Sequence, residues 1–133
     1  MSSTSTFRYW IPVVVYAVLI IVLALRPAGD LPRWPINDKL IHFAEYALFG
    51  CLLFRLLHRN LKATLRLALG MTALGVALFA LLDETLQRFA PGRTPDIRDW
   101  VVDILGAGCG IAIYLLVRHI LDYRAKQRQE GLA

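Results

Sequence analysis

The sequence is poor in cysteine, serine and charge. Its two cysteines, Cys51 and Cys109, lie inside apolar runs and show no CxxC spacing. They therefore predict neither a disulfide framework nor a structural zinc site. The only serines are Ser2, Ser3 and Ser5, at the beginning of the chain. We therefore expect no serine nucleophile among the polar residues further along.

Charged residues make up 19% of the 133 residues, whereas hydrophobic residues make up 57% and give a mean hydropathy of +0.52. A soluble chain of this length buries only about two-thirds of its unfolded surface, so this composition would leave large apolar patches in water. We therefore predict that lipid surrounds much of the chain. The net charge of +5 does not indicate a nucleic-acid partner, because the basic residues lie between long apolar runs.

Four long apolar runs predict transmembrane helices at about residues 9–26, 39–57, 66–83 and 99–118. The predicted fold class is all-α: a four-helix membrane bundle that forms one domain over residues 1–133, with a basic tail at 119–133. A cleaved signal peptide is the alternative for the first run. Its 17 uncharged residues exceed the usual apolar core of such a peptide, and the following Arg26-Pro27 is a poor cleavage site.

The distribution of basic residues predicts that both termini lie in the cytoplasm. With the N-terminus inside, nine Lys and Arg fall on the inner side and six, Arg33 among them, on the outer side. This difference follows the positive-inside rule. The second, third and fourth helices would then place their polar ends, near Asp38, Glu84 and Trp100, at the outer surface.

The second predicted helix has one polar face. Asp38, His42 and Glu45 follow the spacing of successive helical turns, so an imidazole stands between two acids. Asn37 or Asp38 can also cap this helix, so capping is an alternative to a ligand role for Asp38. The alternative for His42 is a packed, hydrogen-bonded histidine.

Small residues form stripes on the third and fourth predicted helices. The third helix continues its stripe into Glu84 and Gln87, and the fourth begins with aspartates that lead into a GxxxG. We expect these two helices to pack small face to small face and to bring the acids into a shared polar site. The predicted packing residues are Gly70, Ala73, Ala77, Ala80, Gly106 and Gly110.

The segment between these helices contains Pro91-Gly92, which predicts a turn, and Thr94 before a proline, which disfavours helix. Arg93 is thus expected on a loop over the polar site. Its guanidinium is suited to a phosphate or to a carboxylate of the site. Pairing with Asp96 or Asp99, which would only hold the loop in place, is the alternative.

The spaced motifs resemble the VanZ-like family of small bacterial membrane proteins. They are DKLIHF with Tyr46 and Gly50, Glu84 and Gln87 as an ExxQ, PGRTPDIRD, and Asp103 with two glycines. The resemblance spans residues 38–110 and implies a multi-pass protein of the bacterial cytoplasmic membrane. The family is named for a member linked to low-level resistance to the glycopeptide teicoplanin, so the resemblance also implies a link to that resistance. The family more often has Asn where this chain has Asp103.

Our leading hypothesis is a protein that binds the headgroup of a lipid-linked envelope precursor at this outward polar site. Arg93 would hold phosphate, and His42 and the acids would orient sugar or water. Membrane lipids, the precursor or a glycopeptide, and a second copy of the chain are the expected partners. No cofactor or metal is part of this hypothesis. The expected ligand-binding residues are Asp38, Lys39, His42, Tyr46, Glu84, Gln87, Arg93, Asp96, Asp99 and Asp103.

The alternative is a membrane-embedded hydrolase or transferase that acts on a phosphate-bearing envelope lipid. His42 would then serve as base or nucleophile and Glu84 as acid, while Asp96, Asp99 and Asp103 would hold a divalent ion through oxygen atoms. No hydrolase signature supports this alternative. Transport ranks below both, because four helices are few and paired half-length segments are missing.

Overall fold

The computed structural model describes residues 3–30 and 37–130, which form helices and turns and contain no strand. Each of the four α-helices in these ranges has a stretch long and apolar enough to cross a membrane, which confirms the predicted all-helical membrane fold. Arg33 and residues 131–133 of the predicted tail lie outside the described residues. The elements are α1 (Ser3–Ala24), the 3-10 turn η1 (Ala28–Asp30), α2 (Asp38–Arg55), the π-helical turn η2 (Leu56–Asn60), α3 (Leu65–Gln87) and α4 (Ile97–Glu130).

Helix α4 continues well beyond the apolar run that predicted it. Sequence patterning placed its end near residue 118, where the hydropathy falls, but the helix extends to Glu130. Pairs of opposite charge one turn apart accompany this extension: Arg118 lies 3.0 Å from Asp122, and Lys126 lies 3.8 Å from Glu130. Such pairs stabilise an exposed helix slightly. The basic tail is therefore helical as far as the described residues extend.

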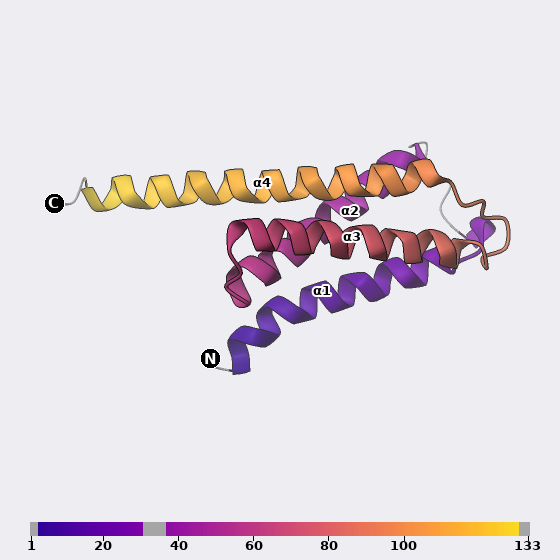
Figure 1. The fold of residues 1–133 in the computed structure, drawn as a ribbon, viewed down its shortest axis with the longest axis horizontal. Helices are drawn as coiled ribbons and strands as arrows, with labels where there is room; N and C mark the ends of the chain where they lie inside the picture. Colours follow the sequence, from indigo (N-terminus) through magenta and orange to yellow (C-terminus); the bar gives the residue numbers. More distant parts are fainter. Residues whose placement is uncertain (1–2, 31–36, 131–133) are drawn as a thin grey trace.

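Helix α2 is the centre of the bundle and packs against the other three helices (Figure 1). Among the described residues, α1 and α4 make no contact with each other. The main core includes Ile20 of α1, Tyr46 and Phe49 of α2, and Val76 of α3. Each helix therefore buries part of its apolar surface against α2 or its neighbours.

The outer faces of the helices remain apolar. Leu74 and Leu78 of α3 are 62% and 59% exposed, and Leu105 of α4 is 61% exposed. In water such a surface would be costly, because each exposed Leu forgoes a hydrophobic gain of about 1.5–3 kcal/mol. Exposed leucines on helices long enough to span a bilayer are instead expected to face lipid.

Gly106 and Gly110 of α4 pack against α2, and not against α3 as the small-residue stripes predicted. A Cβ added at Gly106 would overlap the Phe43 carbonyl, and one added at Gly110 would overlap the Ala47 carbonyl. On the facing surface, a Cβ at Gly50 would lie 2.7 Å from the Ala107 Cα atom. The predicted partner was wrong because a GxxxG spacing indicates a close approach without specifying the neighbouring helix.

The predicted stripe on α3 divides between two environments. Gly70 has no neighbour within 4 Å of an added Cβ, and Ala73 is exposed. Ala77 is half-buried and Ala80 is fully buried. Contact with α4 at this level includes a hydrogen bond in which Trp100 Nε1 donates to the Ala77 carbonyl at 2.9 Å. Only the later part of the stripe therefore lies inside the bundle.

Candidate binding site

The beginning of α2, the end of α3 and the beginning of α4 meet at one end of the bundle, at the right of Figure 1. Most of the buried polar side chains in the described ranges belong to these segments. Helices that run back and forth across a bilayer bring such ends to one surface. The buried polar residues at this end are His42, Asp83, Glu84, Gln87, Asp99 and Asp103.

His42 of α2 and Asp103 of α4 form the most deeply buried polar contact of this cluster. His42 Nδ1 lies 3.1 Å from Asp103 Oδ1, and the two side chains are 5% and 0% exposed. Glu84 of α3 is close to both, since one ligand-type atom from each of the three residues lies within 4.8 Å of the others. The two predicted catalytic candidates, His42 and Glu84, are thus neighbours.

Lys39 forms a second ion cluster nearer the surface. Its Nζ atom lies 2.6 Å from Asp99 Oδ1 and 3.1 Å from Asp96 Oδ2. Asp96 also accepts a hydrogen bond from the Arg98 backbone N–H at 2.9 Å, where α4 begins. These contacts hold the pKa of the Asp96 carboxyl below its ordinary value, the Arg98 N–H first and the Lys39 ammonium second.

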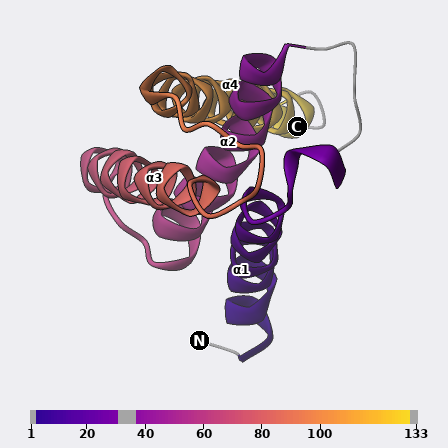
Figure 2. The same cartoon turned by 90° about the vertical axis from the view of Figure 1, so that its right-hand side faces the viewer.

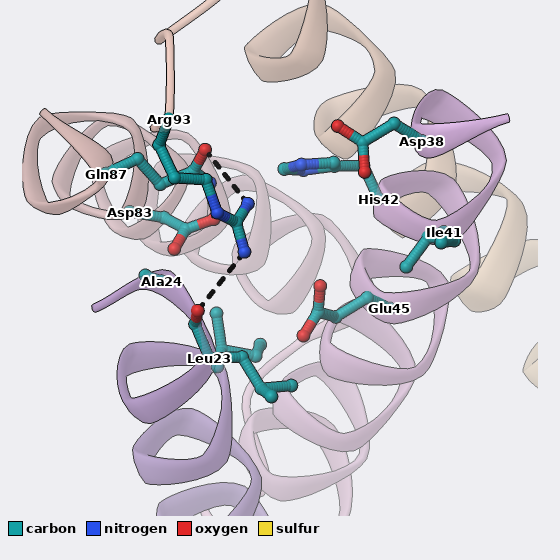
Figure 3. A pocket seen from close by; sticks show the side chains of 10 residues that line it. Leu23, Ala24, Asp38, Ile41, His42, Glu45, Asp83, Gln87 and Arg93 are labelled. Atoms are coloured by element: carbon teal, nitrogen blue, oxygen red, sulfur yellow. Dashed lines mark hydrogen bonds between the residues drawn. The ribbon is translucent and has the colours of Figure 1, made fainter. Parts of the chain in front are cut away.

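Asp38 does not cap α2, although capping was the alternative to its predicted role as a ligand-binding residue. The N-cap of α2 is Asn37, whose Oδ1 accepts a hydrogen bond from the Lys39 backbone N–H at 3.0 Å. Asp38 is exposed at the start of the helix and offers a carboxylate oxygen close to His42 and Asp99. The carboxylate of Asp38 and the imidazole of His42, both on the first turns of α2, therefore line the same cavity (Figure 3).

The loop that carries Arg93 crosses the end of α1, as Figure 2 shows. The turn is made by Gly92, whose φ of 77° lies in the left-handed region that favours glycine. The Ala28 N–H donates to the Pro91 carbonyl at 3.0 Å and so connects this loop to η1. These contacts direct the Arg93 side chain back toward the helices (Figure 3).

Arg93 binds neither of the aspartates that were its predicted alternative partners. One guanidinium nitrogen donates to Gln87 Oε1 at 3.4 Å and the other to the Leu23 carbonyl at 3.2 Å (Figure 3). Its Nε atom is buried and has no hydrogen-bond partner among the described residues. Arg93 thus holds α1, α3 and the loop together, while its Nε–H donor remains unused.

A cavity of about 330 Å³ lies between α1, α2, α3 and the Arg93 loop. Its wall on α1 is apolar, and the walls on α2 and α3 are mainly polar (Figure 3). Its size is within the range of small-molecule sites. The lining residues are Ile20, Leu23, Ala24, Asp38, Ile41, His42, Glu45, Asp83, Gln87 and Arg93.

A model of the VanZ/LLP1 family matches residues 3–118 of the chain. The chain belongs to the VanZ/LLP1 family. The resemblance predicted from residues 38–110 is thereby confirmed, and the match also includes α1, which carries no diagnostic motif. No curated protein and no solved structure matches the chain.

Four of the ten residues that were predicted to bind a ligand in this VanZ/LLP1 protein belong to the cavity wall. Asp38, His42, Gln87 and Arg93 line it directly. The other predicted residues, except Tyr46, divide among the Lys39 cluster, the group that Glu84 and Asp103 form with His42, and a second groove of about 400 Å³. That groove is lined by Leu81, Glu84, Thr85, Arg88, Pro95, Asp96, Ile97 and Trp100.

Tyr46 occupies a different environment from the other predicted residues. Its ring is fully buried in the apolar core and packs edge-on against Phe49 at a centroid distance of 6.1 Å. Its hydroxyl has no hydrogen-bond partner among the described residues. Tyr46 does not line the cavity, so its predicted contact with a ligand has no support from this geometry.

Two acids of the cavity wall, Glu45 and Asp83, were not among the predicted ligand-binding residues. Glu45 lies three residues after His42 on the polar face of α2, and Asp83 lies four residues before Gln87 on α3. Gln87 Nε2 donates to Asp83 Oδ2 at 3.4 Å, which places Asp83 in the same network as Arg93. Helical spacing had already placed Glu45 on the polar face with His42, and the four-residue spacing before Gln87 was the signal that could have identified Asp83.

Proposed function

We propose that this protein binds the headgroup of a lipid-linked ligand of the bacterial cell envelope at the outer side of the cytoplasmic membrane. The supporting observation is the cavity with one apolar wall and polar residues opposite it, at the end of membrane-spanning helices. An amphiphile needs both kinds of surface. Family membership agrees with a membrane protein but does not identify the ligand.

The volume of the cavity indicates which part of an amphiphile would enter. About 330 Å³ suits a sugar or phosphate group rather than a long hydrocarbon chain. Leu23 and Ile41, on the apolar side, are 36% and 39% exposed and so adjoin the outer surface of the helices. The chain of the ligand would therefore lie against that surface while the headgroup enters the cavity.

The polar groups favour a headgroup that combines phosphate with hydroxyl or amino groups. Arg93 offers the donors of a planar guanidinium, which matches phosphate geometry. The carboxylates of Asp38, Glu45 and Asp83 accept hydrogen bonds from hydroxyls or amines and repel a headgroup made of phosphate alone. Lipid-linked sugars of the cell wall combine these groups.

Native mass spectrometry of the purified protein tests this proposal with three probes: a polyprenyl diphosphate disaccharide, polyprenyl phosphate and phosphatidylcholine. We expect the strongest binding for the disaccharide lipid and the weakest for phosphatidylcholine. The Arg93→Ala variant should weaken binding of both polyprenyl lipids about tenfold, since a hydrogen bond to a charged group is worth about 1.5–3 kcal/mol. Arg88→Ala is the matched control, because Arg88 is exposed outside the cavity.

Because Arg93 also holds the loop, a second variant separates binding from folding. Asp38 is exposed and has no hydrogen-bond or capping role within the described residues, so Asp38→Asn should fold normally. It should lower affinity for the disaccharide lipid and leave polyprenyl phosphate binding unchanged. Equal binding of all three probes, or wild-type binding by both variants, would overturn the proposal.

Teicoplanin susceptibility is the cellular measurement that goes with this proposal. Glycopeptides recognise a lipid-linked precursor, so a protein that holds its headgroup competes for the same molecule. We expect expression of the wild-type protein to raise the inhibitory concentration of teicoplanin in a bacterial host and Arg93→Ala to reduce the increase. An unchanged inhibitory concentration would argue against this link.

The contact between His42 and Asp103 favours hydrolysis or group transfer as a second candidate function. A carboxylate that orients an imidazole is the arrangement of a general base, and Glu84 lies within reach of both groups. A phosphate-release assay on the purified protein with polyprenyl diphosphate tests this candidate. Release that depends on His42 would support it, and no release would leave binding as the function.

A further inference from the structure

One side chain from each of α2, α3 and α4 contributes to a compact group of metal-ligand type. His42, Glu84 and Asp103 each offer one atom, and these atoms lie within 4.8 Å of one another. The three residues are 4%, 6% and 0% exposed. The two carboxylate residues are therefore more than nine-tenths buried.

Both carboxylates have an oxygen that lacks a partner. Glu84 Oε1 and Asp103 Oδ2 are buried, and neither has a hydrogen-bond partner among residues 3–30 and 37–130. Within these ranges no Lys or Arg forms an ion pair with either residue. A buried carboxylate is costly unless it is paired, protonated or bound to a metal. The other oxygen of each carboxylate has a partner: Glu84 Oε2 accepts a hydrogen bond from the Asp96 N–H at 3.0 Å, and Asp103 Oδ1 lies 3.1 Å from His42 Nδ1. Glu84 Oε1 and Asp103 Oδ2 are therefore the two oxygen atoms available to a cation.

The neighbouring acids already have a cation. Asp38, His42 and Asp99 also bring ligand-type atoms within 4.8 Å of one another, but Lys39 Nζ lies 2.6 Å from Asp99. Lys39 also pairs with Asp96. The hydrolase alternative suggested a metal site with oxygen ligands from Asp96, Asp99 and Asp103. Two of these carboxylates, Asp96 and Asp99, already pair with Lys39, so only Asp103 is available to a metal ion.

We propose that His42, Glu84 and Asp103 bind a divalent transition-metal ion through one imidazole nitrogen and two carboxylate oxygens. Two ligand atoms on a metal at about 2.0–2.2 Å are separated by about 3.0–3.5 Å. The 3.1 Å hydrogen bond between His42 Nδ1 and Asp103 Oδ1 holds these two atoms at a separation that an ion could bridge in place of the proton. An imidazole ligand favours ions such as Zn²⁺, Ni²⁺ and Cu²⁺ over Mg²⁺, Ca²⁺ and Mn²⁺. This inference goes beyond the proposed function, because it requires no lipid.

Metal binding by the full chain, purified in detergent with any affinity tag removed and treated with chelator, tests the inference. Isothermal titration with Zn²⁺ should give one equivalent, and Co²⁺ should produce visible absorption bands of a bound ion. Glu84→Gln and Asp103→Asn should each weaken binding by about tenfold or more, because even loss of an outer-shell partner costs about 10- to 100-fold. Asp122→Asn is the matched control, since this exposed acid of α4 belongs neither to the cavity nor to the trio.

A spectroscopic measurement keeps the test decisive if those two variants fold poorly. The chain has three histidines, and neither His58 nor His119 belongs to the trio. In the variant that carries His58→Ala and His119→Ala, nitrogen hyperfine coupling to bound Cu²⁺ should persist, because His42 remains. Loss of the coupling in this variant, or a stoichiometry well below one equivalent in the wild type, would overturn the proposal. Binding that depends on Asp99 and not on Glu84 would also overturn it.

Discussion

His42 and Asp103 are 61 residues apart in the chain, and their side chains meet at 3.1 Å between α2 and α4. Neither residue is accessible from the side of the helix that faces lipid, since they are 4% and 0% exposed. A buried pair of this kind adds little net stability compared with apolar residues, but removal of one member leaves the other without its partner. The pair therefore determines how α2 and α4 must align.

The three histidines provide a graded test of this contact. His42→Ala should lower the free energy of unfolding by about 3–5 kcal/mol, because it leaves Asp103 buried without its partner. His58→Ala should cost less, since His58 is only half-buried and contacts one backbone carbonyl, that of Ala63. His119→Ala should cost nothing measurable, because His119 is exposed. Reversible unfolding in detergent, with all samples free of metal, gives these values.

If His42→Ala were no more destabilising than His119→Ala, the α2–α4 alignment described here would be wrong at this level.

The close approach of α4 to α2 predicts the effect of one added methyl group. Gly110→Ala should destabilise the protein by about 1–3 kcal/mol, because its Cβ would overlap the Ala47 carbonyl and force the helices apart. Gly108→Ala is the control on the same helix, since nothing lies within 4 Å of a Cβ there. Thermal unfolding in detergent should show a lower Tm for the first variant and no decrease for the second. Equal Tm values would contradict the packing of α4 on α2.

The lowered pKa of Asp96 predicts that this residue stabilises the fold more at neutral pH than at acidic pH. The Arg98 N–H and the Lys39 ammonium lower the pKa of Asp96 in the folded protein. The carboxylate therefore contributes stability above the ordinary Asp pKa of about 3.9, and this contribution is lost as the pH falls through the lowered folded pKa. The wild type should have a higher Tm than Asp96→Asn at pH 6, and the difference should disappear as the pH decreases below about 4. A difference that grows on acidification would contradict this assignment.

Sequence patterning predicted the helices and their convergence but not their rotation. The runs of Leu, Val, Ala and Ile identified the spans, and the spacing of Asp38 and His42 placed both on one face of α2. Gly106 and Gly110 indicated a close helix contact but not whether α2 or α3 made it. Rotation depends on packing between segments far apart in the sequence, which a single helix period does not contain.

The same limit explains the partners of the charged residues. Arg93 was expected to bind phosphate or a nearby aspartate, yet it donates to Gln87 and to a backbone carbonyl of α1. The two aspartates, Asp96 and Asp99, instead form ion pairs with Lys39. The sequence contained no motif from which the contribution of α1 to the cavity wall could be predicted. The residues concerned, Ile20, Leu23 and Ala24, are ordinary residues of a membrane helix.

The most direct test of the central claim is the side of the membrane on which the polar ends lie. Single cysteines at Asp38, Arg88 and Thr94, and at Arg66 and Arg124 on the opposite end, are introduced into a chain that lacks Cys51 and Cys109; all five positions are exposed. In intact spheroplasts an impermeant maleimide should label positions 38, 88 and 94, while positions 66 and 124 should react only after lysis. Labelling that divides positions 38, 88 and 94 between the two sides of the membrane would contradict a shared site.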